Sequence, residues 1–469
     1  MTEKDTVPFG VSNDTYAWLA KLPASLSPVM RVHHYRPSGF GSTIMPFATG
    51  NADLASEMYA GRFLFGGKRI SASPREVFSN VETKLEWLAH FNTSNRGLHD
   101  QYAMRLLHYW SKAKRSKSDI TTQIQTLLAL ATDGQMIARR CDASVQASLF
   151  DIIADVLKKL IHMRAQSAEQ NTGKAIALLY CLHSFQGLGH LREMAYELIE
   201  RNLHLVILPD GGHVSRKTTA LINLLKHAVP LAQANSPVTP PQLLRSVENA
   251  LALLKLKQCP DGRLSGLLDE VEDTELLQHL LGVQNIEIPK LNFAPHSCFA
   301  RIEHERATVI ADTSAKLGLD FSDGKQRLIK TEFCGLDIAK PSMMQDVPQG
   351  TVLMMENAVQ KRTCFLSADG EDLRVEDDVS NGDVIIQVAA GIKLSSLLEG
   401  QAVMLILPNQ TVWHLKLRGG ILDIRQSNSQ FEIIIRSKQI GPINWSLKKQ
   451  ARAVKIPRKK QSFESGLLI

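Results

Sequence analysis

The character of the sequence changes once, near residue 286, and this change limits the fold more than any other feature. From about Glu76 to Val283, hydrophobic residues recur at the spacing of one helix face. From Ser297 onward, short segments of alternating hydrophobic and polar residues follow one another, separated by clusters of Gly, Asn and Asp. The sequence therefore predicts a helical part followed by an antiparallel β-sandwich.

The helical part is predicted as a series of antiparallel hairpins. Ser118 and Asp119 can cap a helix that runs through Leu127–Leu130, and Asp142–Arg164 has the pattern of a longer amphipathic helix. Further helices are expected at Lys174–Leu182, Leu191–Ile199, Thr218–Ala228 and Pro240–Leu256. Short loops between successive helices indicate an α/α array curved into part of a toroid or a solenoid, and the lack of a strict repeat disfavours a regular solenoid.

The expected strands occupy most of the chain beyond Ser297. They are predicted at Phe299–Ile302, Ala307–Ala311, Gln326–Thr331, Val352–Glu356, Arg362–Ser367, Asp383–Val388, Val403–Leu407, Val412–Leu417, Phe431–Arg436 and Ile443–Leu447. The predicted organisation is an irregular extension with one short helix (residues 1–75), a helical domain (76–285), a sandwich domain (295–447) and a basic tail (448–469) that we expect to be disordered.

The formal net charge of +7 is concentrated near the end of the chain. Seven basic residues and no acidic residue lie between Lys448 and Lys460, so the rest of the chain sums to about zero. A solvated tail is the simplest interpretation, and a tail that binds nucleic acid or acidic lipid is the alternative. No base-reading motif accompanies the basic residues, so no nucleic-acid partner is predicted.

Several features concern cofactors and compartment. The six cysteines are scattered without a C-x-x-C pair, which is typical of free thiols in a reducing compartment and predicts no metal site. No segment has the length and hydrophobicity of a transmembrane helix. The N-terminus lacks the pattern of a signal peptide, which predicts a cytoplasmic location.

Short motifs along the chain resemble those of the heparinase II/III-like family of polysaccharide lyases. Leu208–Arg216 (LPDGGHVSR) resembles the family's DGGH-x-(E/S)-R segment, and Ala60–Gly67, Trp87–Phe91 and Lys361–Gly370 resemble others in the same order. The resemblance implies an incomplete (α/α) toroid followed by an antiparallel β-sandwich. It further implies a carbon–oxygen lyase that acts without a cofactor on an acidic, uronate-containing polysaccharide or oligosaccharide by β-elimination. Because such lyases commonly work outside the cytoplasm, it leaves a periplasmic or cell-envelope location open.

The residues that would carry this chemistry in the family are largely replaced. A uronate lyase neutralises the sugar carboxylate, removes the adjacent proton with a base and returns a proton to the leaving oxygen. In the family an Asn, a Tyr after the DGGH segment and a His from the sandwich serve these steps. Here the tyrosine position falls on Ala220, only Asn171 can substitute for the Asn, and the corresponding sandwich segment Ala311–Ser322 contains no histidine. The resemblance therefore implies a degraded active site.

Six residues are the candidates for the site. His213, Arg216 and Asn171 are predicted as catalytic, and His90, Asn92 and Asp210 as substrate-binding. His213 can also be interpreted as holding the turn at Asp210, and Arg216 as a solvated cation.

Three hypotheses follow. The chain is an active lyase with a rearranged site, a non-catalytic relative that keeps the cleft for carbohydrate binding or as a scaffold, or a nucleic-acid or envelope-associated protein acting through its basic tail.

Overall fold

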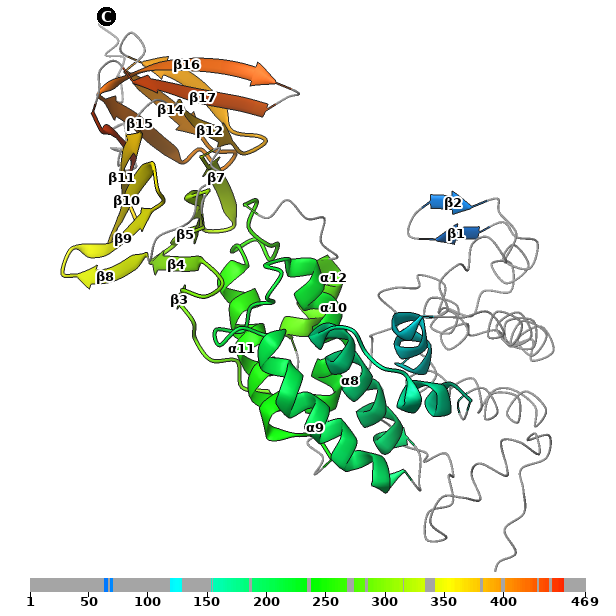
Figure 1. Ribbon diagram of the computed structural model, residues 1–469. Helices are drawn as coiled ribbons and strands as arrows, with labels where there is room; N and C mark the ends of the chain where they lie inside the picture. The colour runs from blue at the N-terminus through cyan, green and yellow to red at the C-terminus, as the bar shows by residue number, and fades with distance from the viewer. Residues whose placement is uncertain are drawn as a thin grey trace, which may run out of the picture. The chain divides into compact units, whose positions relative to one another are not determined.

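The computed structural model describes two compact units of the chain (Figure 1). The described residues are 63–65, 68–70, 119–128, 153, 155–184, 188–233, 238–267, 274–282, 286–314, 316–333, 342–379, 383–397, 401–427, 430–437 and 441–450. The first unit is helical and ends at Ser297, and the second unit begins at Cys298. Two short segments, Cys259–Asp261 and Ser265–Leu267, belong to the second unit although helical-unit residues flank them.

The helices of the first unit follow the hydrophobic periodicity of the sequence. Residues 120–128 and 155–162 are helical, and the Asp119 side chain caps the first of them by accepting a hydrogen bond from the Thr122 N–H at 2.7 Å. The helices that follow are α8 (Ala168–Ser184), α9 (Arg192–Asn202), α10 (Thr218–Gln233), α11 (Pro241–Lys257) and α12 (Thr274–Leu281), with the 3₁₀ turns η1 (Gly189–Leu191) and η2 (Leu203–Leu205). A small hairpin pairs β1 (Phe63–Phe65) with β2 (Lys68–Ile70).

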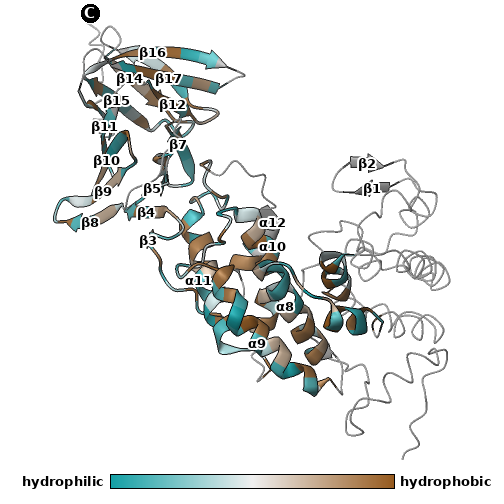
Figure 2. Ribbon diagram, in the orientation of Figure 1, coloured by the Kyte–Doolittle hydropathy of each residue, from teal (hydrophilic) through white to brown (hydrophobic). Residues whose placement is uncertain are grey.

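The core of the helical unit lies along one face of each helix. In α11 the side chains of Leu243, Val247, Ala250, Leu251 and Leu254 are buried at the spacing of a single face. Figure 2 shows hydrophilic and hydrophobic residues alternating along α9 and α11, as amphipathic helices require. Burying these apolar surfaces against neighbouring helices stabilises the helices far more than their intrinsic propensities do.

The strands that follow the helices form two eight-stranded antiparallel sheets. The first has the order β13-β14-β15-β18-β11-β10-β9-β8, and the second has the order β16-β17-β12-β7-β6-β5-β4-β3. The strands are β3 (Phe293–Ala294), β4 (Phe299–His304), β5 (Ala307–Asp312), β6 (Gly318–Asp323), β7 (Gln326–Thr331), β8 (Met343–Val347), β9 (Gly350–Glu356), β10 (Gln360–Ser367), β11 (Asp372–Val379), β12 (Val384–Val388), β13 (Lys393–Leu397), β14 (Ala402–Ile406), β15 (Val412–Arg418), β16 (Gly420–Ser427), β17 (Gln430–Ser437) and β18 (Ile443–Lys449).

A fully buried ion pair lies between the two sheets. Arg362 on β10 and Asp377 on β11 are both 0% exposed, and their closest atoms, Nε and Oδ1, are 2.6 Å apart. Arg362 also donates to the carbonyl of Leu317 at 2.7 Å and to the hydroxyl of Thr331 on β7, which belongs to the other sheet. The indole N–H of Trp445 donates to Asp377 at 2.8 Å. The pair therefore holds β7, β10, β11 and β18 together inside the sandwich.

A second buried carboxylate, Asp320 on β6, fixes the segments that join the second unit from earlier in the chain. Its Oδ2 accepts hydrogen bonds from the Ser265 hydroxyl at 2.9 Å and the Gly266 N–H at 2.8 Å. Close by, Arg327 on β7 forms a 3.0 Å ion pair with Asp261. These contacts explain why Cys259–Asp261 and Ser265–Leu267 belong to this unit.

The observed layout confirms the predicted order of a helical part followed by a β-sandwich. Each segment predicted as a strand overlaps a strand of the structure, and the strands that were not predicted are β1, β2, β3, β6, β8, β11, β13 and β16. Strand β18 ends at Lys449, so the first two basic residues that the sequence groups with the tail are strand residues. The one short helix predicted in the extension 1–75 is expected at Tyr16–Leu22, which lies outside the described residues. None of the helices in the described ranges combines the length and hydrophobicity needed to cross a membrane.

Candidate functional site

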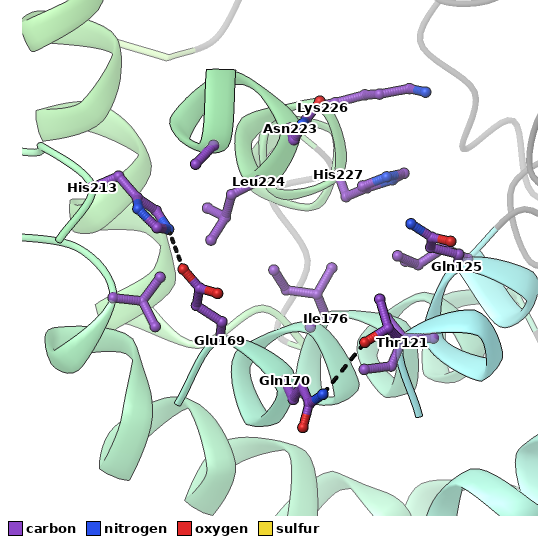
Figure 3. Close-up of a pocket in the computed structure, with 15 residues that line it drawn as sticks. Thr121, Gln125, Glu169, Gln170, Ile176, His213, Asn223, Leu224, Lys226 and His227 are labelled. Atoms are coloured by element: carbon purple, nitrogen blue, oxygen red, sulfur yellow. Dashed lines mark hydrogen bonds and ion pairs between the residues drawn. The ribbon is translucent and has the colours of Figure 1, made fainter. Parts of the chain in front are cut away.

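The helical unit contains a pocket of about 550 Å³ (Figure 3). Residues of helix 120–128, α8, the loop before α10, and α10 itself line it. Its aliphatic wall consists of Ile124, Leu128, Ile176, Val206 and Leu224, and its polar groups are Thr121, Gln125, Glu169, Gln170, His213, Asn223, Lys226 and His227. Amide, carboxylate and imidazole groups beside an aliphatic wall are typical of a pocket that orients a hydroxyl-rich ligand.

Two helices present the same periodic face to this pocket. Glu169, Gln170, Gly173 and Ile176 come from α8, and Ala220, Asn223, Leu224 and His227 come from α10. Within each set the residues are spaced as on one side of an α-helix. The Gln170 amide donates to the Thr121 hydroxyl at 3.4 Å, which connects α8 to helix 120–128 at the edge of the pocket.

His213 is the buried polar centre of the pocket. Its Nε2 lies 3.2 Å from Oε1 of Glu169, and Figure 3 shows the ring pointing at this carboxylate. Only 4% of the His213 side chain is exposed, whereas 58% of the Glu169 side chain is exposed. Glu169 is therefore the member of the pair that solvent or a ligand reaches.

The hydrogen bonds around His213 fix its tautomer. The Ser215 backbone N–H donates to Nδ1 at 3.1 Å, and the Ser215 hydroxyl lies 2.7 Å from the same nitrogen. Because Nδ1 accepts from an N–H group, the ring proton must reside on Nε2, which donates to Glu169. Burial lowers the pKa of His213 below its ordinary value of 6.5, and the negative charge of Glu169 opposes this shift only in part. His213 is accordingly a neutral hydrogen-bond donor whose basic nitrogen is already occupied.

The turn that carries His213 is tied to the end of the helical unit. Asp210 accepts hydrogen bonds from the backbone N–H of Ser297 at 2.8 Å and from the Ser297 hydroxyl at 2.6 Å. Gly211 has a φ of +89°, a conformation that glycine adopts without steric cost. A side chain at Gly211 would also collide with the backbone carbonyl of Asn249. Asp210 and Gly211 thus both stabilise the turn, and the turn places His213 at the pocket.

The structure brings some of the predicted site residues together and separates others. His213 lines the pocket, and so does Ala220, the position that corresponds to the family's tyrosine. Asn171 donates from its side-chain amide to Asn202 at 3.1 Å and is not among the lining residues.

The remaining candidates lie elsewhere. Arg216 is exposed with a φ of +57° and is not a lining residue, and Asp210 uses its carboxylate in the turn. His90 and Asn92 lie outside the described residues.

Sequence reasoning missed Glu169, the partner of His213. The family resemblance covers this segment, but the residue predicted from it was Asn171, two positions further along α8. A shift of two residues moves a side chain by about 200° around a helix, which is enough to take it off the pocket face. The helical spacing of Glu169, Gly173 and Ile176 indicated that these residues share one face of α8. Spacing alone does not indicate which other segment of the chain packs against that face.

A metal site is not evident in the part of the chain that the structure describes. No three His, Cys, Asp or Glu side chains there lie close enough together to hold an ion. Burial raises the pKa of the Cys259 thiol, chiefly through desolvation and then through the charge of Asp320. A thiol with a raised pKa is a poor nucleophile and a poor metal ligand.

Comparison with solved structures identifies the fold. The sequence matches no family model and no curated protein sequence. In structure, the chain is similar to the heparan sulfate lyase HepC from Pedobacter heparinus, with a TM-score of 0.57, 10% identity, and coverage of 89% of this chain and 86% of that one. It is also similar to a heparinase III gene product, with a TM-score of 0.57, 11% identity, and coverage of 96% and 91%. At this identity the likeness concerns the fold alone, and the chain has a distant polysaccharide-lyase-like fold.

Proposed function

We propose that this chain is a heparinase II/III-like, lyase-type protein with a degraded active site, which binds an acidic, uronate-containing polysaccharide or oligosaccharide in the pocket around His213. The observation that carries the proposal is that His213 and Ala220 line the same pocket. The histidine of the DGGH segment is present, and an alanine occupies the wall where the family resemblance calls for a tyrosine. We also propose that the helical unit forms part of an (α/α) toroid.

The groups in the pocket suit binding better than proton transfer. β-Elimination needs a base for the proton next to the sugar carboxylate and an acid for the leaving oxygen. His213 cannot readily act as the base, since Nδ1 accepts from Ser215 and Nε2 carries the proton donated to Glu169. Among the described lining residues no tyrosine is available as the acid. The amides of Gln125 and Asn223 remain able to bind sugar hydroxyl or carboxylate groups.

Binding and turnover are measured separately to test this proposal. We expect the full-length protein to bind uronate oligosaccharides in calorimetry without producing the ultraviolet-absorbing unsaturated product of β-elimination. His213→Ala should weaken binding about tenfold, because it removes the donor that orients the Glu169 carboxylate. His190→Ala changes an exposed histidine that does not line the pocket and serves as the control. Unchanged binding in His213→Ala would contradict the proposed site.

A matched pair of substitutions tests the replaced tyrosine. Ala220→Tyr adds a hydroxyl to the pocket wall, and Ala220→Phe adds a ring of nearly the same size without it. We expect the Ala220→Tyr variant to form more of the unsaturated product than the Ala220→Phe variant. Product formed by the unaltered protein would instead favour an active lyase with a rearranged site.

A further inference from the structure

The first sheet of the second unit is divided into halves of opposite charge. Its strands β13, β14, β15 and β18 are adjacent in the sheet and contain no Asp or Glu. The other four strands, β8 to β11, contain six acidic residues, at positions 346, 356, 372, 376, 377 and 378. A segregation of this kind within one sheet creates a local positive potential although the chain as a whole carries a modest charge.

The basic side chains of the first half lie on its exposed face. On β15 the side chains of Trp413, Leu415 and Leu417 are buried, so the alternate positions His414, Lys416 and Arg418 point outward. On β18 the buried residues are Ile443, Trp445 and Leu447, and Asn444, Ser446 and Lys448 point outward. Lys393, at the start of β13, is exposed as well. We call the outward side chains of β13, β14, β15 and β18 the cationic half-sheet.

The strand register brings three of these cations close to one another. His414 pairs with Lys448, Lys416 pairs with Ser446, and Arg418 pairs with Asn444. Directly opposite residues on one face have Cβ atoms about 5 Å apart, and diagonal or same-strand neighbours are about 7 Å apart. Lys416 is therefore within reach of the same ligand as both Arg418 and Lys448. The neutral Asn444 and Ser446 between them supply hydrogen-bonding groups.

The nearest acidic groups border this surface on β11, where Asp372 is the register partner of Lys448 and the exposed Glu376 is the register partner of Asn444. On β11, which follows β18 in the sheet, Asp372 is bonded to Arg374 at 2.6 Å, so this pair is neutral. In the turn before β11, the pKa of Asp369 is lowered mainly by the Ser367 hydroxyl and to a smaller degree by the charge of Lys448. Toward β14 the neighbouring outward residues are Met404 and Ile406, which carry no charge and are partly exposed. The positive surface is thus open on the β14 side.

We propose that the cationic half-sheet is a second binding surface for an acidic polysaccharide, separate from the pocket of the helical unit. The proposal rests on the proposed function for its ligand class. Several cations about 7 Å apart can contact more than one carboxylate of an extended polymer at the same time, and Met404 offers an apolar contact for sugar C–H groups. Five further basic residues follow in the sequence between Arg452 and Lys460, before the acidic Glu464.

The composition of this face favours an acidic polysaccharide over nucleic acid or a membrane. Proteins that bind single-stranded nucleic acids stack bases on aromatic side chains. The tryptophans of β15 and β18, Trp413 and Trp445, are both buried within the sandwich instead. A membrane-binding surface combines cations with large apolar side chains that insert into the lipid, and among the described side chains of this face the apolar candidates are the partly exposed Met404, Ile406 and Val412.

A triple substitution tests the proposal on the full-length protein. Lys416→Gln/Arg418→Gln/Lys448→Gln removes three charges from the cationic half-sheet. The control Lys325→Gln/Arg425→Gln/Arg436→Gln removes three exposed charges from β16, β17 and the turn between β6 and β7, so both variants have the same net charge. The probe is a polygalacturonate oligomer, measured by fluorescence anisotropy at low and at physiological salt.

We expect the first variant to bind the oligomer roughly tenfold more weakly at low salt, with a smaller salt dependence, and the control to differ by less than about twofold. Equal weakening in both variants, or no binding by the unaltered protein, would overturn the proposal. So would tighter binding of single-stranded DNA, or of phosphatidylserine vesicles, that the first variant abolishes. The outcome is separable from the proposed function, because His213→Ala alters the pocket and leaves these strands unchanged.

Discussion

The buried Arg362–Asp377 pair offers the most direct test of how the sandwich is held together. Asp377→Ala removes the carboxylate that accepts from Arg362 at 2.6 and 3.0 Å and from the Trp445 indole at 2.8 Å. Arg362 is 0% exposed and stays charged, so its guanidinium would be left without a counter-ion. Breaking one side of a buried pair costs about 3–5 kcal/mol. For a domain of this size that loss lowers the melting temperature by roughly 6–20 °C.

The measurement must report on the second unit alone, because a two-unit chain need not unfold in one step. Hydrogen exchange of the amides in β10, β11 and β18 during a urea titration meets this need. Asp423→Asn is the control, since Asp423 is 45% exposed and its ion pairs with Arg425 and Arg436 are worth at most about 1 kcal/mol.

The double variant Arg362→Met/Asp377→Leu separates the cost of an orphaned charge from the value of the pair. We expect it to recover most of the lost stability, because apolar side chains of similar volume replace buried ion pairs well. The Trp445 N–H would still lack its acceptor, which accounts for about 1–3 kcal/mol of remaining loss. If Asp377→Ala were no less stable than Asp423→Asn, the reasoning would be refuted.

Two further predictions concern the turn and the pocket of the helical unit. Gly211→Ala should destabilise this unit by more than Gly262→Ala, because both glycines have a φ of +89° but only Gly211 faces the backbone of Asn249. The left-handed conformation at both positions costs an alanine about 1–2 kcal/mol. Equal losses of unfolding free energy in the two variants would therefore argue against the steric contact at Gly211. The second prediction is a loss of stability as the pH falls below 6.5. The pKa of His213 is lowered in the folded protein, so the unfolded chain takes up the proton first. His213→Gln should flatten this part of the stability–pH curve, and a curve unchanged by the substitution would speak against a buried, neutral His213.

The alternation of hydrophobic residues predicted most of the sandwich, and two of the strands it missed, β6 and β11, contain a buried charge. Strand β11 has the sequence DLRVEDDV, in which the acidic residues suggest a loop. Leu373, Val375 and Asp377 nonetheless alternate inward, and Asp377 is buried because Arg362 lies opposite it. In β6 the buried Asp320 is satisfied by Ser265 and Gly266. A strand with a buried charge is predictable only when its distant partner is known.

Only part of the candidate site was predicted, because its other contacts also depend on segments distant in the sequence. The Asp-Gly-Gly-His turn is local, so its sequence was enough to predict that His213 is a special residue. The identity of its partner depends on how α8 packs beside that turn, and the sequence favoured Asn171 over Glu169. Nδ1 of His213 is occupied because it accepts a hydrogen bond from the backbone N–H of Ser215. A motif of side-chain types does not predict such a backbone contact.

The bonds between Asp210 and Ser297 have a consequence for how the protein is made. Ser297 lies 87 residues after Asp210, so the turn beside the pocket gains its anchor only when the chain has been synthesised beyond the last helix. During translation the helices can assemble earlier, since their contacts are more local. A fragment cut at residue 285, where helical periodicity ends, would therefore keep its helices and lose the support of the Asp-Gly-Gly-His turn. A fragment that extends through Ser297 is the smallest one expected to retain a properly shaped pocket.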